Sequence, residues 1–177
     1  MSATNRALVN QKLSCARALL KLINDLPTPL PANQRALQVG LLQGAVFHLI
    51  TAYRFYLREI AENHQIQTHA QINNENQLSA ALESSGKASS DASELASLQH
   101  DSDSWLAKLY GAYAAIGQLP VKKDIDHAEA AHDHLIAAVL IDQESPDAEV
   151  LTAQQLLAWE KAFSDLISRQ REVGAEY

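Results

Sequence analysis

The stretch Val39–Ile60 places apolar residues on almost every side of the helix that it would form. Such a helix needs neighbours on several sides, because each apolar face is stabilised by removal from water. We therefore predict that Val39–Ile60 belongs to the central helix of a bundle. A membrane span is not expected, since Gln43, His48, Thr51 and Arg54 leave no run of the ~18 apolar residues that a bilayer requires.

Composition favours helices over the rest of the chain as well. The 177 residues include only six glycines and five prolines, and Ala, Leu and Gln are abundant. A chain of this length is the size of one ordinary domain with one core. We therefore predict an all-α protein in which residues 1–177 form a single-domain bundle of five or six helices around one long central helix.

Helix-breaking and helix-capping residues divide the chain into the elements of this bundle. Three prolines within Leu26–Pro31 predict an extended turn between the first helix and the long one. Gly117 and Pro120 end a later helix, and Thr152 with Gln155 three residues on predicts a capping box at the last one. The helices are predicted at Ala3–Asp25, Ala32–Asn63, Glu75–Glu83, Ala92–Leu98, Asp103–Ile116 and from Thr152 to about Gly174.

Two segments do not show a clear helical pattern. Residues 65–90 are polar and rich in serine, and we predict a flexible loop there around the short helix Glu75–Glu83. The run 135–142 is apolar, and its length fits a buried turn of helix, a strand or a packed extended segment equally well. If this run is not covered within the chain, it would form an interface between two copies.

Charge is distributed unevenly along the chain. Residues 1–64 carry seven Lys/Arg and three Asp/Glu, a net of +4, whereas residues 65–177 carry seven and eighteen, a net of −11. We expect these opposite charges to face each other inside one domain, although the positive part would also attract an acidic partner. No nucleic-acid partner is expected, because the pI is about 5.4 and no dense basic patch is present.

The single cysteine, Cys15, cannot form a disulfide within the chain, and the first residues contain no continuous apolar segment of the kind that directs secretion. We therefore expect a soluble, cytoplasmic protein without a membrane partner. The sequence contains no nucleophile elbow, phosphate-binding glycine loop or paired-cysteine zinc motif, so no cofactor is expected.

The densest group of potential metal ligands lies between residues 126 and 134. Glu129 and His132 form one Glu-x-x-His pair, of the kind that di-iron helical bundles carry on two helices. Because one copy of this pair is present, a charged helix surface is the simpler interpretation. The candidate metal ligands are Asp126, His127, Glu129, His132, Asp133 and His134.

His48 and two glycines stand out on the predicted central helix. His48 lies in its most apolar part, and we expect a buried, neutral side chain with one hydrogen bond to a neighbouring helix. Gly40 and Gly44 lie one helical turn apart and could permit the close approach of another helix, although isolated glycines are also tolerated in soluble helices.

Five short motifs occur at intervals along most of the chain, namely Asn10-Gln11-Lys12, Phe47-His48-Leu49, Glu59-Ile60-Ala61, Ser104-Trp105-Leu106 with Leu109, and Leu156 to Trp159 with Leu166. Together they resemble a family of small, all-helical proteins of unknown function from Pseudomonas-like gammaproteobacteria. The resemblance implies a helical fold and a bacterial source, and it carries no activity.

Arg58 and His64 have the spacing of a catalytic pair in another helical family. Some HEPN-type bundles are ribonucleases that use an Arg and a His separated by four to six residues on one helix, and five residues separate Arg58 from His64. The resemblance implies that His64 would transfer a proton and that Arg58 would stabilise the phosphorane. Residues six positions apart do not share a face of a regular helix, so a solvated helix end is the simpler interpretation.

We therefore expect a non-enzymatic, cytoplasmic bacterial protein that acts as an interaction or accessory module, with an unknown protein or a second copy as its partner. A HEPN-like ribonuclease or toxin-type bundle and a metal-binding helical bundle are the alternatives. If a functional surface lies on the central helix, we expect it at the basic stripe of Arg54 and Arg58.

Overall fold

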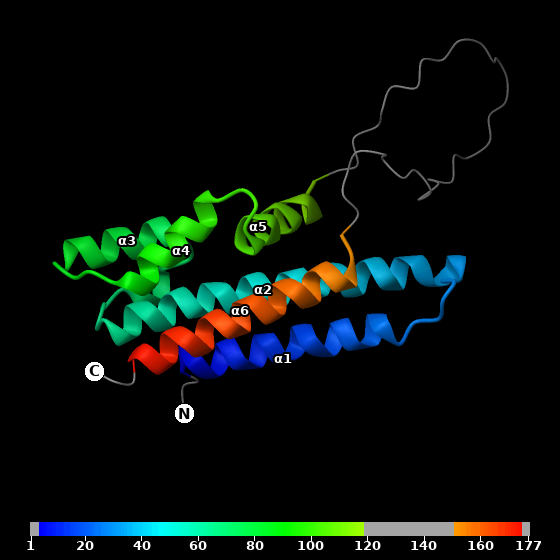
Figure 1. Cartoon of the computed structure of the whole chain (residues 1–177), viewed down its shortest axis with the longest axis horizontal. Coiled ribbons are helices and arrows are strands. Elements are labelled where there is room, and N and C mark those ends of the chain that lie inside the picture. Colours follow the sequence, from blue (N-terminus) through cyan, green and yellow to red (C-terminus); the bar gives the residue numbers. More distant parts are fainter. Residues whose placement is uncertain (1–3, 119–150, 175–177) are drawn as a thin grey trace, which may run out of the picture. The chain divides into compact units, whose positions relative to one another are not determined.

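Six α-helices form the part of the chain that the computed structural model describes, which is residues 4–118 and 151–174 (Figure 1). They are α1 (Asn5–Asn24), α2 (Arg35–Asn63), α3 (Glu75–Ser84), α4 (Ser90–His100), α5 (Trp105–Ile116) and α6 (Ala153–Gly174), with the 3-10 helices η1 (Ala32–Gln34) and η2 (His69–Gln71). No strand is present among these residues. The predicted all-α bundle of five or six helices with one long central helix is confirmed.

The three long helices α1, α2 and α6 lie side by side, and the short helices α3, α4 and α5 lie along α2 (Figure 1). The most extensive packing is between α1 and α2, which are joined by the proline-rich turn. α6 contacts α1, α2 and α5, and all six helices belong to one compact unit. α2 therefore has neighbours on several sides, as its apolar pattern predicts.

Local hydrogen bonds determine where the helices begin. In the described part of the chain, five side-chain oxygens accept from a backbone N–H in the first turn of the following helix, those of Thr4, Asn74, Ser89, Ser104 and Thr152. Because Ser89 is the cap, α4 begins two residues earlier than predicted. The predicted capping box is confirmed, since Thr152 N donates to Gln155 Oε1 at 2.8 Å and Gln155 N donates to Thr152 Oγ1 at 3.2 Å.

Residues 65–90 contain more regular structure than the predicted polar loop. They include η2, α3 and the start of α4, and the short helix predicted within them corresponds to α3. Four widely spaced apolar residues in this segment are buried, namely Ile66, Ile72, Leu78 and Leu82. Their burial outweighs the turn preference of the Asn and Ser residues between them, which is why the polar composition was misleading.

The core surrounds only part of α2. All eleven buried residues of α2 lie between Ala45 and Ala61, and none of its first ten residues, Arg35–Gly44, is buried. Figure 1 shows that the start of α2 extends beyond the nearby ends of α5 and α6. The long helix is therefore central over its C-terminal two thirds, and its N-terminal third keeps apolar residues at the surface.

Two helical glycines give a matched prediction about stability. A Cβ added at Gly111 in α5 would meet no heavy atom within 4 Å, whereas one added at Gly44 in α2 would lie 3.0 Å from Leu19 Cδ1 of α1. Gly111→Ala is therefore expected to raise the free energy of unfolding by up to about 1 kcal/mol, and Gly44→Ala is expected to gain less because Leu19 must move. Urea unfolding of both variants checks this expectation, and equal gains would contradict it.

Candidate functional site

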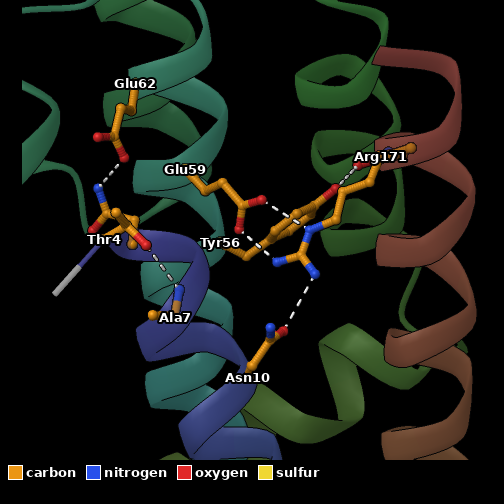
Figure 2. A network of polar contacts seen from close by, with 9 residues as sticks. Thr4, Ala7, Asn10, Tyr56, Glu59, Glu62 and Arg171 are labelled. Atoms are coloured by element: carbon orange, nitrogen blue, oxygen red, sulfur yellow. Dashed lines mark hydrogen bonds and ion pairs between the residues drawn. The ribbon is translucent and has the colours of Figure 1, made fainter. Parts of the chain in front are cut away.

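An ion pair between α2 and α6 forms the centre of a polar network near the C-terminal end of α2 (Figure 2). Arg171 Nε donates to Glu59 Oε1 at 2.8 Å, and Arg171 Nη2 donates to Glu59 Oε2 at 2.7 Å. Arg171 Nη1 also donates to Asn10 Oδ1 of α1 at 3.3 Å. Glu59 is buried and Arg171 is half-buried, so this bidentate ion pair joins α2 to α6 inside the bundle. The hydrogen bond to Asn10 adds α1 to the network.

A second set of hydrogen bonds connects α6 with α2 and α4. Tyr56 Oη donates to Gln170 Oε1 at 2.6 Å, and Gln170 Nε2 donates to Glu94 Oε2 at 2.8 Å. Arg169 donates to the same carboxylate of Glu94, and this hydrogen bond lowers the pKa of Glu94. The polar clasp is the name used below for Asn10, Tyr56, Glu59, Glu94, Gln170 and Arg171.

A cavity of about 890 Å³ borders the polar clasp. Its lining includes Arg6 of α1, Glu59 and Glu62 of α2, His64 at the end of α2, and Asp91 of α4. Burial raises the pKa of the Asp91 carboxyl. The cavity offers both hydrogen-bond donors and acceptors to a polar molecule, and its mixed charges do not select the charge of that molecule.

Arg58 and His64, the pair expected in a HEPN-like nuclease, have different surroundings. Arg58 donates from Nε to Ile72 O at 2.8 Å and from Nη2 to Asn73 Oδ1 at 2.6 Å. Its guanidinium carbon also lies 5.3 Å from the centroid of the Phe55 ring. His64 lines the cavity beside the polar clasp, and Arg58 does not. Arg58 therefore holds the segment between η2 and α3 against α2, and the geometry gives no support to a shared catalytic site.

Arg54, the other member of the predicted basic stripe, lies over an aromatic ring of α5. Its guanidinium carbon is 5.3 Å from the centroid of the Tyr113 ring. Arg54 and Arg58 are both half-buried. Both guanidinium groups therefore take part in packing within the bundle, and they offer less free charge to an acidic partner than the sequence suggested.

Replacing Arg58 by Ala is expected to lower the free energy of unfolding by about 1–2 kcal/mol, because two charge-assisted hydrogen bonds of a half-exposed side chain are lost. We expect no effect of Arg58→Ala or His64→Ala on RNA that is incubated with the protein. Urea unfolding and a fluorescent RNA cleavage assay measure the two quantities. A cleavage activity that disappears in both variants would instead favour the nuclease alternative.

Two buried tyrosines predict a loss of stability at alkaline pH. Tyr53 donates to Glu75 Oε1 and Tyr56 donates to Gln170 Oε1, and burial raises the pKa of both phenols above 10.0. Above about pH 10 the unfolded chain releases these protons while the folded chain keeps them, so the unfolded state is favoured by about 1.4 kcal/mol per pH unit for each tyrosine. Urea unfolding between about pH 8 and 11 measures this effect. The free energy of unfolding of Tyr56→Phe should fall less steeply with rising pH than that of the wild type. Parallel declines would contradict the prediction.

His48 lies at the edge of the core rather than fully inside it. It is half-buried, and burial together with the nearby charge of Lys12 lowers its pKa. Its Nδ1 atom is buried without a hydrogen-bond partner in the described part of the chain. The expected hydrogen bond to a neighbouring helix is therefore not found there, and the low pKa keeps the ring neutral near pH 7.

The N-terminal part of α2 carries a second candidate site, which is apolar. Leu37 is 51% exposed and Phe47 is 49% exposed. Phe47, but not Leu37, lines a groove of about 620 Å³ that residues of α2 and of the C-terminal end of α5 form. The apolar face of α2 is the name used below for the row Leu37, Gly40, Gly44 and Phe47.

The length and composition of this helix would also allow it to cross a membrane. The helix Ala32–Asn63 contains a window of mean hydropathy 1.3, of which 33% is buried inside the bundle. The core helix of a soluble protein can satisfy the same criterion, so the absence of a membrane partner stays a prediction.

Metal ligation is not supported by the residues that the structure describes. Among residues 4–118 and 151–174, no group of three or more His, Cys, Asp or Glu side chains is placed to hold a metal ion. The predicted candidates between Asp126 and His134 lie outside the described residues, as does the apolar run 135–142. The expected charged surface at residues 126–134, its metal-binding alternative and the conditional interface at residues 135–142 are therefore not tested by the structure.

The helices and contacts define a small all-α bundle whose last helix is held by a buried ion pair. The chain belongs to a family of unknown function, DUF6586, whose model matches residues 1–177. The expected membership of a helical family of unknown function is thereby confirmed, whereas the bacterial source and the likeness to HEPN-type bundles stay predictions. No curated protein and no solved structure matches the chain.

Proposed function

We propose that this chain is a non-enzymatic interaction or accessory protein of the bacterial cytoplasm, which binds a protein partner through the apolar face of α2. The observation that carries the proposal is the exposure of Leu37 (51%) and Val39 (46%) in the stretch Arg35–Gly44, which has no buried residue, although Leu41 and Leu42 pack partly against the core. Contiguous exposed apolar surface is typical of interaction sites, because its removal from water by a partner is favourable.

The charged groups are consistent with a binding role. Glu59 and Arg171 neutralise each other's charge inside the bundle. Arg58 donates a hydrogen bond to the backbone of the segment before α3. A general acid or base must instead exchange its proton with a bound substrate. A cytoplasmic location is supported by Cys15, the single cysteine of the chain, which is half-buried and free.

Protection of a cysteine on the apolar face tests the proposal. In a Cys15→Ser background, Leu37→Cys and Val173→Cys place thiols at positions of similar exposure, 51% and 53%, and only the first belongs to the apolar face. In lysate of the native host, the thiol of Leu37→Cys is expected to react with a maleimide several-fold more slowly than in purified protein diluted to nanomolar concentration. The thiol of Val173→Cys is expected to react equally fast in both. An unchanged rate at position 37 would rule out an interaction through this face.

A further inference from the structure

The solvent side of α2 continues beyond its apolar face without a break. Thr51, Arg54 and Arg58 follow Phe47 at intervals of four, three and four positions, so they lie on the same side of the helix. None of these residues is buried, and none of the residues of the apolar face is buried either. From Leu37 to Arg58 this side of α2 is about 30 Å long. Its first half is apolar, and its second half carries two arginines.

Neither arginine is paired with a carboxylate among the residues that the structure describes. Arg58 donates hydrogen bonds to Ile72 O and Asn73 Oδ1, which are uncharged acceptors. Arg54 lies over the Tyr113 ring, and its buried Nε atom has no hydrogen-bond partner in that part of the chain. Packing therefore fixes both guanidinium groups and engages some of their N–H groups, but it does not cancel their positive charge.

Acidic side chains are absent from α2 until close to its C-terminal end. No Asp or Glu occurs at positions 26–58, and the first acid after them, Glu59, is buried in the polar clasp. The first exposed acid is Glu62, one turn beyond Arg58, and it accepts a hydrogen bond from Asn5 of α1. Along its solvent side, α2 therefore presents an apolar surface that is followed by a positive one.

We propose that the partner of the apolar face is a protein segment with apolar side chains at one end and acidic side chains at the other, which lies along α2 with its acidic end at Arg54 and Arg58. The inference rests on the proposed binding role of the apolar face, and it adds the chemistry of the partner. Burial of apolar surface favours the contact, and the complementary charges determine the direction in which the segment lies.

The order of apolar and basic residues favours this partner over two other occupants. A second copy of the chain that used the same surface would offer no acidic side chain at positions 26–58 to the arginines. A helix that lies on an anionic membrane carries basic residues beside its apolar side chains, along the polar face. On α2 the apolar and basic residues instead follow one another along the helix, which matches a segment with the same order of apolar and acidic side chains.

The dependence of binding on the charge of Arg54 tests the proposal. Purified Leu37→Cys in a Cys15→Ser background is added to a dilution series of native-host lysate, and the amount of lysate that halves the maleimide rate is measured. Adding Arg54→Gln is expected to raise this amount at least about fivefold, because a charge at the contact is lost. Arg54→Lys keeps the charge and is expected to change it by less than about twofold. Lys161→Gln, at an exposed position of α6, is expected to leave it unchanged.

Photo-cross-linking tests the direction of the segment. p-Benzoylphenylalanine in place of Leu37 and in place of Thr51 places the two probes about 20 Å apart along α2. Mass spectrometry of the products formed in lysate is expected to identify the same protein from both positions. The peptide joined to position 51 should be acidic, and the peptide joined to position 37 should be apolar. A basic or uncharged peptide at position 51 would overturn the proposal.

The binding role and the chemistry of the partner can fail separately. If lysate does not protect Leu37→Cys at all, the binding role falls and the inference falls with it. Protection that Arg54→Gln leaves unchanged keeps the binding role and overturns the acidic partner. A cross-linked product of twice the chain mass of 19.4 kDa that contains only this chain overturns it in favour of a homodimer. Protection that is lost when membranes are sedimented, and that phosphatidylglycerol vesicles restore, overturns it in favour of a lipid surface.

Discussion

Replacing Arg171 by Leu is expected to lower the free energy of unfolding by about 3–5 kcal/mol. The guanidinium group donates both hydrogen bonds of the pair with Glu59, whose side chain is only 7% exposed. Without Arg171, that carboxylate loses its charge partner while it remains largely out of water, and Leu replaces most of the lost volume. Equilibrium urea unfolding at pH 7, followed by far-UV circular dichroism, measures the change.

Arg169→Leu is the matched control for this prediction. Arg169 lies on the same helix and also donates two hydrogen bonds to one carboxylate, that of Glu94, but its side chain is 59% exposed. Solvent screens such a pair, so we expect a much smaller change. The double variant Glu59→Leu with Arg171→Leu should recover most of the lost stability, because neither charge is then buried alone. Equal losses from Arg171→Leu and Arg169→Leu would contradict a buried role for the polar clasp.

The helix boundaries could be predicted because their signals are local. The prolines in Leu26–Pro31 separate α1 from the long helix, and the reciprocal bonds of Thr152 and Gln155 begin α6. Each of these signals acts within a few residues, so a single sequence contains it. Residues 65–90 were the exception. Their few buried apolar residues predict ordered structure only when the helix that packs on them is known.

The polar clasp could not be predicted in the same way. Glu59 and Arg171 are 112 positions apart, and local sequence hardly distinguishes Arg171 from the exposed Arg169. One signal was available, because Arg171 lies four positions after the buried Ile167, which itself lies four positions after the buried Phe163. An arginine on the buried side of a helix needs an anionic or polar partner inside the bundle. The sequence does not identify that partner as Glu59.

The apolar face of α2 shows a second limit of sequence patterns. The all-round apolar pattern of Val39–Ile60 predicts neighbours on several sides, and buried positions begin only at Ala45. Periodicity tells which residues are apolar, but it does not tell how far other helices extend along them. Here α5 ends at Ile116 and α6 begins at Ala153, and the start of α2 extends beyond both ends (Figure 1). The same pattern is therefore compatible with a core and with a binding face.

Replacing Phe163 by Ala is expected to lower the free energy of unfolding by about 3–5 kcal/mol. Phe163 of α6 is fully buried, and its ring centroid lies 5.4 Å from that of Trp105 in α5, 5.7 Å from that of Tyr53 and 5.9 Å from that of Tyr56 in α2. Ala leaves a cavity where three helices meet, and the large rings around it cannot all move to fill it. Urea unfolding followed by Trp fluorescence measures the loss. Leu157→Ala, at a position of α6 that is 36% exposed, is expected to lower the free energy of unfolding much less than Phe163→Ala does.

Hydrogen exchange in the Phe163→Ala variant shows how α6 is coupled to the rest of the bundle. The Phe163 ring joins α6 to α5 through Trp105 and to α2 through Tyr53. Amides of α5 and α6 should therefore exchange faster together, whereas α1 and the buried part of α2, which pack extensively on each other, should change less. If only α6 exchanges faster, then α2 and α4 hold α5 in place without α6, and the aromatic cluster does not link α5 to α6.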